Sequence, residues 1–430
     1  MFLNKIYPKE AVLRLILYIV SFFLFLSLVG ISYVRINKLF LLQRPPGGDE
    51  GVYLKALLTA NSSGIPTAIS QGCSLPFLFF SYLLDAFLKN PLISIRTTSL
   101  LSGITLVLIS IFITRKKLGL NNYYGCFALL ALLNLLVVRS NIFAGINDVL
   151  LAVFGLLFMI SFHNFLKYSK TLIIPALLMS LIIITRKMAI SYLLVFEFIF
   201  LCFIIFAKPK NRNFNLKAFI KFNLLSILFF LIFNLYGLIN FGQLTWEDKS
   251  LPAKINWAQW DYYNAMLIDK GLQERDHHIA VEETIIYLEK NGQKSLPSNF
   301  LEMIYFDPIL TIKEFFFDFF TSWKYILRLL ALLIFIYPYV LIHSKFKKVN
   351  LKFGLTAHFW YAFAFSYVLF ISFAVIANIQ PRWFTFFLPF IIYLLFMELS
   401  KFEKKYTTPF LLTNNLLLLA WNLPFLIKHL

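Results

Sequence analysis

Long apolar runs separated by short polar stretches make up most of this 430-residue chain. A helix needs about 20 apolar residues to cross a hydrocarbon layer of about 30 Å. Backbone groups inside lipid are satisfied only in helices or closed barrels. The pattern predicts an all-α polytopic membrane protein with about eleven transmembrane helices. The predicted spans are residues 11–34, 92–114, 121–138, 142–165, 171–185, 188–207, 217–240, 323–343, 355–377, 383–400 and 407–427.

Two of the polar connections are long, at residues 35–91 and 241–322. We divide the chain into a transmembrane module at 1–240, which includes the first long segment, the second long segment at 241–322, and C-terminal transmembrane helices at 323–430. A chain whose non-membrane mass is concentrated on one face is expected to work on that face.

Short helices are predicted within both long segments. Residues 51–62 have apolar positions at helical spacing and are expected to form an interfacial helix. Residues 74–88 are apolar but short for a span, so an interfacial or re-entrant helix is expected there. In the second segment, the stretch VEETIIYLEKNG predicts a helix that ends at Gly292. Asp307 and Pro308 are expected to be the cap and the first residue of the next helix.

Composition and charge agree with a membrane protein. Hydrophobic residues make up 60% of the chain and charged residues 14%, which is more apolar surface than a water-soluble core could hide. The net charge of +19 comes from lysines and arginines clustered in short connections, as in the cytoplasmic loops of membrane proteins, and nucleic acid is not an expected partner. The N-terminus is then cytoplasmic and both long segments lie outside. The bacterial inner membrane is the expected location, since no endoplasmic reticulum retention signal is present.

Several classes of site are disfavoured by the sequence. Cys73, Cys126 and Cys202 are scattered and give neither a disulfide framework nor zinc-ligand spacing, and the six histidines form no metal-ligand pattern. No glycine-rich stretch that could cradle a nucleotide follows a predicted strand. We therefore expect no metal and no cofactor.

Ionisable residues in or beside the predicted spans are costly and need a reason. Three acids lie at the outer ends of predicted spans, two of them in the glycine-framed stretch PPGGDEGVY and one at the start of NDVLLAVF. Four cations are expected on the same face. The acids are Asp49, Glu50 and Asp148, and the cations are Arg96, Arg186, Lys187 and Arg382.

These residues have structural alternatives. The adjacent acids could form a solvated turn, and Asp148 could be a helix cap or the partner of a nearby arginine. Arg186, Lys187 and Arg382 could be anchors whose heads reach the membrane surface. Together, however, they suit transfer from a phosphate-linked donor. Cations would bind the departing phosphate, and a carboxylate would accept a proton from the acceptor.

Four stretches in this order carry a family resemblance. They are GGDEGVYLKALLTANSSGIP; SLPFLFFSYLLDAF followed by IRTTSLLSG; NDVLLAVF; and LIIITRKMA together with PRWFTFFLPFIIYL. The chain resembles the GT-C superfamily of polyprenyl-phosphate-sugar glycosyltransferases, in particular its protein mannosyltransferase and lipid A aminoarabinose transferase branch. The similarity covers roughly residues 9–210 well and the remainder loosely.

This resemblance implies a sugar transfer from a polyprenyl-phosphate donor to an unknown protein, lipid or glycan acceptor, in the periplasm or a lumen. Asp49 would be the catalytic base or would polarise the acceptor, Glu50 would assist it, and Asp148 would be the second acid. The lipid phosphate would be bound by Arg96, Lys187 and Arg382, with Arg186 as their neighbour. The chain departs from the family at Gln71–Ser74, where many members have a histidine or lysine, and it has no Asp-x-Asp motif, which argues against a metal-dependent branch.

Two other classes of function are compatible with the sequence. A multi-span transporter or flippase for a lipid-linked sugar would also contain many spans and membrane-level charges, although such folds often show internal repeats that are not evident in this chain. A non-catalytic membrane protein that binds a polyprenyl lipid is the second alternative.

Overall fold

The computed structural model describes residues 6–39, 45–117, 122–139, 142–206, 214–247, 255–275, 277–346, 354–374 and 379–429. Throughout these ranges the regular secondary structure is helical, and no strand occurs in them. The prediction of an all-α chain is confirmed for this part of the protein.

Eight helices in the described ranges are long and apolar enough to cross a membrane. Seven of these candidate spans each lie within one α-helix. The eighth runs from Pro308 to Ile342 through three consecutive elements, α14 (Pro308–Leu330), η4 (Ala331–Phe335) and α15 (Ile336–Phe346). The seven are α1 (Ile6–Leu39), α5 (Pro91–Lys117), α7 (Asp148–Tyr168), α9 (Ala189–Phe206), α10 (Leu216–Phe241), α16 (Leu355–Ala374) and α18 (Lys404–His429).

The predicted count of eleven spans is not supported by helix length. Three of the predicted spans correspond to shorter apolar helices, which by themselves do not reach the usual spanning length. These are α6 (Asn122–Asn134) with the π-helix η2 (Leu135–Arg139), α8 (Ile173–Thr185) and α17 (Leu388–Leu399). Over the residues it describes, the structure supports an all-α membrane protein with eight helices of spanning length.

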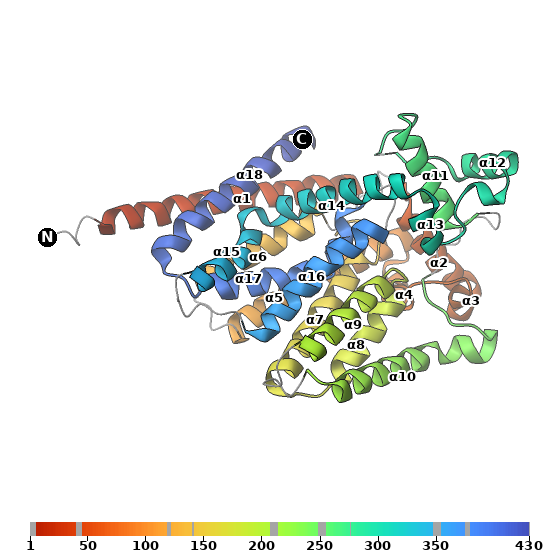
Figure 1. Ribbon diagram of the computed structural model, residues 1–430, viewed down its shortest axis with the longest axis horizontal. Helices are drawn as coiled ribbons and strands as arrows, with labels where there is room; N and C mark the ends of the chain where they lie inside the picture. Colours follow the sequence, from red (N-terminus) through yellow and green to blue (C-terminus); the bar gives the residue numbers. More distant parts are fainter. Residues whose placement is uncertain are drawn as a thin grey trace.

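Helix α7 lies at the centre of the bundle (Figure 1). Two thirds of its most apolar window is buried, 67%, against 22% to 50% in the other seven span candidates. Phe158 and Phe162 of α7 contact rings from α9, α10 and α16, including Phe196 and Trp360. Aromatic edge-to-face contacts of this kind add to the apolar packing. The first residue of α7, Asp148, is therefore attached to the most enclosed of the eight helices of spanning length.

Helices α1 and α10 lie at the periphery (Figure 1). Only 28% and 22% of their apolar windows are buried, and side chains such as Leu224 and Ile239 are more than half exposed. A helix that is apolar on its outer surface is suited to lipid. The peripheral helices thus present the expected membrane-facing surface.

The first long segment folds into α2 (Asp49–Ser63), α3 (Ile65–Ser70) and α4 (Leu75–Leu88). Tyr53, Leu57 and Phe77 form a small core of their own, which continues onto Ile95 of α5 and Leu150 of α7. The predicted helices at 51–62 and 74–88 are confirmed, and α2 begins two residues earlier than expected, at Asp49.

The second long segment contributes α11 (Trp257–Asp269), α12 (Val281–Asn291), η3 (Gln293–Ser295) and α13 (Phe300–Phe306), which also share a separate core. Gly292 ends α12 with a φ of 89°, and the Asp307 side chain accepts hydrogen bonds from the backbone of Ile309 and Leu310 at 3.0 and 3.1 Å. The predicted helix end and helix cap are both confirmed.

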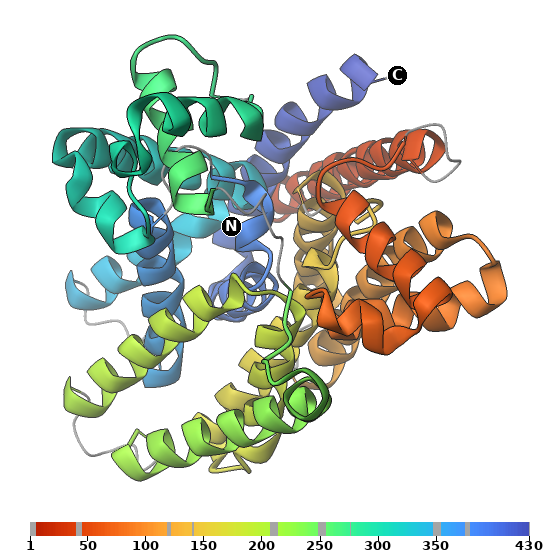
Figure 2. The ribbon, with the colours of Figure 1, turned by 90° about the vertical axis from the view of Figure 1, so that its right-hand side faces the viewer.

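Both long segments lie at the same end of the bundle (Figure 1). Viewed onto that end, α2 to α4 form one group and α11 to α13 another, and the chain that leaves α10 runs between them (Figure 2). The predicted site residues at the ends of the long helices are therefore expected to lie beneath these two groups of short helices.

Candidate functional site

Arg382 joins two of the predicted acids. It lies in the short 3₁₀ helix η5 (Pro381–Phe384), and its Nη1 is 2.5 Å from Asp49 Oδ2 and 3.2 Å from Asp148 Oδ2. Asp49 is the first residue of α2 and Asp148 the first of α7. One guanidinium therefore connects residues that are far apart in the sequence. Asp49 and Asp148 also favour these helix starts because carboxylates interact well with a helix N-terminus.

Gly48 allows α2 to begin at this place. Its φ of 55° lies in the left-handed region that a glycine adopts without a steric penalty. The chain turns at Gly48 and enters the helix at Asp49, so the two acids are held in the first helical turn. The glycine-framed stretch is thus a helix start and not an extended solvated loop.

Asp148 has a second cation beside it. Arg186 immediately follows α8 in extended conformation and forms an ion pair with Asp148. Both side chains are almost completely buried. A pair that is removed from water in this way is stable only when each charge keeps its partner. Lys187, the next residue, is exposed.

Glu50 and Arg96 form a second enclosed pair of the cluster. Arg96 Nε and Nη2 donate to the two Glu50 carboxylate oxygens at 2.7 and 3.0 Å, and Arg96 has no exposed surface. The backbone N–H of Gly145 donates to Glu50 Oε1 at 3.0 Å. Such a two-pronged geometry fixes both side chains. Arg96, predicted to bind phosphate, faces a carboxylate inside the protein.

Three residues of the cluster were not identified from the sequence. Tyr53 donates a hydrogen bond to Glu247, and Asn147 Nδ2 lies 3.3 Å from the same carboxylate oxygen, Glu247 Oε1. Asn147 also donates to the backbone oxygen of Thr185 at 2.6 Å. Tyr53 could have been found as the residue one turn after Asp49 on the same helix face. Glu247 has the weaker signal of being an acid just beyond a predicted span.

Burial raises the pKa of the Tyr53 hydroxyl well above its ordinary value of 10.0, with the Glu247 charge as the next cause. Both effects disfavour a phenolate in this place. Tyr53 therefore remains a hydrogen-bond donor at physiological pH, and it can donate to a carboxylate but cannot act as the base of the site.

Exposure is graded across the cluster. The side chains of Asp49 and Arg382 are 21% and 15% exposed, whereas those of Asp148, Glu50 and Arg96 are at most 7% exposed. A molecule that approaches from outside would therefore meet Asp49 and Arg382 first. The arrangement offers an accessible carboxylate and an accessible guanidinium, supported from behind by buried ion pairs.

Within the described residues, no group of three or more histidine, cysteine or acidic side chains has the arrangement that a metal ion needs. His277 and His278, which the sequence places in a polar stretch of the second long segment, are both exposed.

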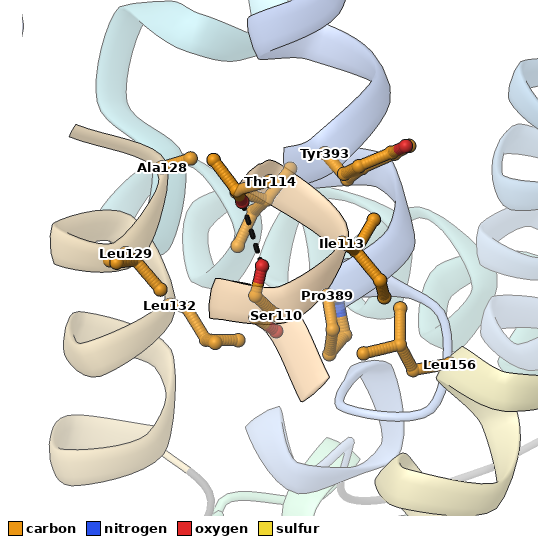
Figure 3. Close-up of a pocket in the computed structure, with 10 residues that line it drawn as sticks. Ser110, Ile113, Thr114, Ala128, Leu129, Leu132, Leu156, Pro389 and Tyr393 are labelled. Carbon is orange, nitrogen blue, oxygen red and sulfur yellow. Dashed lines mark hydrogen bonds between the residues drawn. The ribbon is translucent and has the colours of Figure 1, made fainter. Parts of the chain in front are cut away.

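A pocket elsewhere in the bundle is lined mainly by apolar side chains of α5, α6, α7 and α17 (Figure 3). Ser110, Thr114 and Tyr393 carry its polar side-chain atoms, and Thr114 donates a hydrogen bond to the Ser110 backbone. Ser110 is 14 residues along α5 from Arg96, which corresponds to about 21 Å at the rise of an α-helix. The pocket is therefore separate from the polar cluster and offers no charged group for chemistry.

Comparison with protein-family models, with curated proteins and with solved structures finds no match to this chain.

Proposed function

We propose that this protein is an integral membrane glycosyltransferase of the GT-C type, which moves a sugar from a polyprenyl-phosphate donor to an acceptor on the outer or lumenal face. The observation that carries the proposal is the contact of Arg382 with both Asp49 and Asp148 at the accessible edge of a buried charge cluster. In the proposed topology the three shorter apolar helices also cross the membrane, which gives eleven spans, an N-terminus in the cytoplasm and a site on the periplasmic side of a bacterial inner membrane.

In this proposal Arg382 exchanges partners when the donor binds. A phosphate monoester or diester competes with a carboxylate for the same guanidinium, because both offer paired oxygen acceptors. When the lipid phosphate takes Arg382, the Asp49 carboxylate loses its cation and becomes available to the acceptor. Lys187 adds a second positive charge from the exposed side.

The transfer step conserves atoms and charge. The acceptor oxygen or nitrogen forms a bond to the anomeric carbon of the sugar, and its proton passes to the Asp49 carboxylate. The bond between the anomeric carbon and the phosphate oxygen breaks, and its electron pair stays on the phosphate. Arg382 and Lys187 stabilise the negative charge that develops there, and polyprenyl phosphate is the second product.

The remaining residues of the cluster hold Asp49 and Arg382 in position. Asp148 and Arg186 form the buried pair behind Arg382, and Asp148 helps to aim the guanidinium. Glu50 and Arg96 fix the first turn of α2, so that Asp49 faces Arg382. We therefore assign Arg96 and Glu50 to positioning within the proposed site, in place of direct contact with substrate.

The proposal is tested by a transfer assay. Membranes that contain the protein are incubated with radiolabelled polyprenyl-phosphate sugars, and sugar transferred to endogenous acceptors is followed over time. Loss of a positioned general base is worth about 10²- to 10⁴-fold in rate, so Asp49→Asn is expected to reduce transfer by that factor. Asp148→Asn is expected to reduce it by about tenfold or more, because one partner of Arg382 and Arg186 is neutralised.

Glu282→Gln serves as the matched control, because Glu282 is an exposed acid on α12, outside the cluster. Its transfer rate should equal that of the unmodified protein. Full transfer by Asp49→Asn would contradict the proposal. Movement of the intact lipid-linked sugar across sealed vesicles, unaffected by Asp49→Asn and without transfer, would instead favour a flippase.

A further inference from the structure

The chain that follows α10 is folded back before it reaches the cluster. Gly242 ends α10 in the left-handed region, with a φ of 65°. Three residues later, the backbone N–H of Thr245 donates to Asn234 Oδ1 at 2.6 Å, and the Thr245 hydroxyl lies 3.2 Å from the same oxygen. Asn234 is completely buried in α10. This stretch is therefore attached to α10, and it delivers Glu247 to a defined place.

At that place Glu247 contacts residues next to both acids that face Arg382, Asp49 and Asp148. Tyr53, which donates to Glu247, is one turn after Asp49 on α2 and faces the same side of the helix. Asn147, which donates to the same oxygen, is the residue directly before Asp148. Glu247 is 4% exposed, so these hydrogen bonds lie away from water. A single buried carboxylate oxygen thus joins α2, the start of α7 and the beginning of the second long segment.

We infer that Glu247 is a positioning residue, which holds the start of α2 and the start of α7 in the relative placement that brings Asp49 and Asp148 to Arg382. The effect of Glu247 on catalysis rests on the proposed glycosyl transfer. The hydrogen-bonded link from Tyr53 and Asn147 to Glu247 does not depend on that proposal. Because Glu247 lies near the start of the second long segment, the link also ties the placement of the two acids to that segment.

The link has a specific chemical requirement. Tyr53 and Asn147 both donate to Oε1 of Glu247, so a single acceptor oxygen at this position serves both donors. A glutamine has such an oxygen and can accept from both donors, whereas an alanine removes the acceptor that Tyr53 and Asn147 share. Asn147 keeps its other hydrogen bond, to the backbone oxygen of Thr185. An unsatisfied buried donor costs about 1–3 kcal/mol. Glutamine keeps an acceptor oxygen at position 247 and alanine does not, so comparing the two variants tests whether the hydrogen bonds to this oxygen hold the link together.

Cys73 is a natural reporter of this link. Its thiol is 8% exposed and packs in the same small core as Tyr53. Gln243 Nε2 lies 3.5 Å from the backbone oxygen of Ser70, so the stretch that leads to Glu247 passes beside the turn that carries Cys73. Release of Glu247 should loosen this region and expose the thiol. Replacement of Cys126 and Cys202 by alanine leaves Cys73 as the single cysteine of the chain.

The test measures the rate at which a small maleimide modifies Cys73 in the full-length protein in lipid nanodiscs. Loss of a buried hydrogen bond to a charged group should raise the labelling rate about tenfold in Glu247→Ala and several-fold in Tyr53→Phe. Glu247→Gln should stay within about twofold of the parent, and Glu282→Gln should match it. The double variant Glu247→Ala/Tyr53→Phe should label no faster than Glu247→Ala alone, because the two changes remove the same interaction.

Labelling of Glu247→Ala at the parent rate, or additive effects in the double variant, would overturn the inference. If Glu247→Ala does not fold, the labelling rates of Tyr53→Phe and Glu247→Gln still test the inference. The link predicts faster labelling of Cys73 in Tyr53→Phe and an unchanged rate in Glu247→Gln. The reverse pattern would contradict the link. In the transfer assay, Tyr53→Phe should lower kcat with an unchanged donor KM. If no variant or parent transfers sugar, the proposed function fails while the labelling result still stands.

Discussion

Asp49 and Glu50 are neighbours in the sequence but have opposite surroundings. Successive residues of an α-helix point about 100° apart, so the two carboxylates at the start of α2 cannot face the same partner. Glu50 points into the protein toward Arg96, and Asp49 points toward Arg382 and remains partly exposed. This difference selects Asp49 as the acid that could meet a substrate. The family resemblance also implies Asp49 as the catalytic carboxylate, but it does so from a sequence motif, whereas the structure shows the contact with Arg382.

The Glu50–Arg96 pair makes a prediction about stability at the residue scale. Arg96→Met leaves Glu50 as a buried carboxylate without its guanidinium, and breaking a buried pair in this way costs about 3–5 kcal/mol. We expect a large fall in the thermal unfolding midpoint of the purified protein in detergent.

The double variant Glu50→Leu/Arg96→Met is the control, because it removes both charges together. Replacement of a buried ion pair by apolar side chains is often neutral, so the double variant should recover most of the loss. A single variant as stable as the parent would show that the pair does not hold α2 in place.

At the scale of elements, the site depends on a close approach between α7 and the chain after η5. A Cβ at Gly155 of α7 would lie 2.6 Å from the backbone oxygen of Phe386, which follows Arg382 by four residues. Asp148 and Arg382 are thus carried by two elements in direct backbone contact.

Gly155→Ala is expected to push these elements apart. Overpacking of this kind costs about 1–3 kcal/mol, and here it should also weaken the contact between Arg382 and Asp148. We expect a lower unfolding midpoint together with weaker binding of a labelled polyprenyl-phosphate sugar. Gly51→Ala is the matched control for stability, since a Cβ there meets no atom within 4 Å. Equal stability of the two variants would contradict the close approach.

The second long segment has a pH dependence of its own. Burial raises the pKa of the Asp261 carboxyl in α11 from 3.8 to about 7. Between these values the folded segment binds a proton that the unfolded segment does not, so its stability falls as the pH rises from about 4 to about 7 and is constant above that.

Asp261→Asn keeps the shape of the protonated acid and should remove this dependence. Limited proteolysis of the segment between pH 5 and pH 8 measures it. The parent should be cleaved faster at pH 8 than at pH 5, after correction for the protease's own pH profile, and the asparagine variant should not. Equal pH dependence in both proteins would exclude Asp261 as the cause.

For the whole molecule, the sequence predicts more of the architecture than of the site. Apolar periodicity is strong enough to locate the membrane helices and the short helices at 51–62 and 74–88. Helix length was harder to predict, because α6, α8 and α17 are also apolar and differ from the helices of spanning length in being shorter. Of the predicted site residues, Asp49, Asp148, Arg186 and Arg382 come together, as do Glu50 and Arg96.

Pairing within the cluster is the part that the sequence could not supply. Which arginine faces which carboxylate depends on how α2, α5, α7 and η5 pack, and no local pattern encodes that. Glu247 and Tyr53 were missed for the same reason, since their contact joins residues that are 194 positions apart.

Orientation in the membrane gives a further prediction at this scale. The distribution of lysine and arginine predicts that both long segments lie outside. Cysteines introduced at Ser63 and at Lys170, both exposed, should differ in their access to a membrane-impermeant thiol reagent added to intact cells. We expect labelling at position 63 and none at position 170 until the membrane is opened. The opposite result would place the polar cluster on the cytoplasmic side.

The most direct test of the central claim is a single-turnover experiment on purified protein in nanodiscs, loaded with a labelled polyprenyl-phosphate sugar and then mixed with acceptor extract. Arg382→Ala should bind the donor about 10- to 100-fold more weakly, as expected for a lost charge-assisted contact. Asp49→Asn should bind the donor as tightly as the parent and yet transfer its sugar at least about 100-fold more slowly. Transfer by Asp49→Asn at the parent rate, from donor that is equally well bound, would contradict the role of Asp49 and with it the proposed reaction.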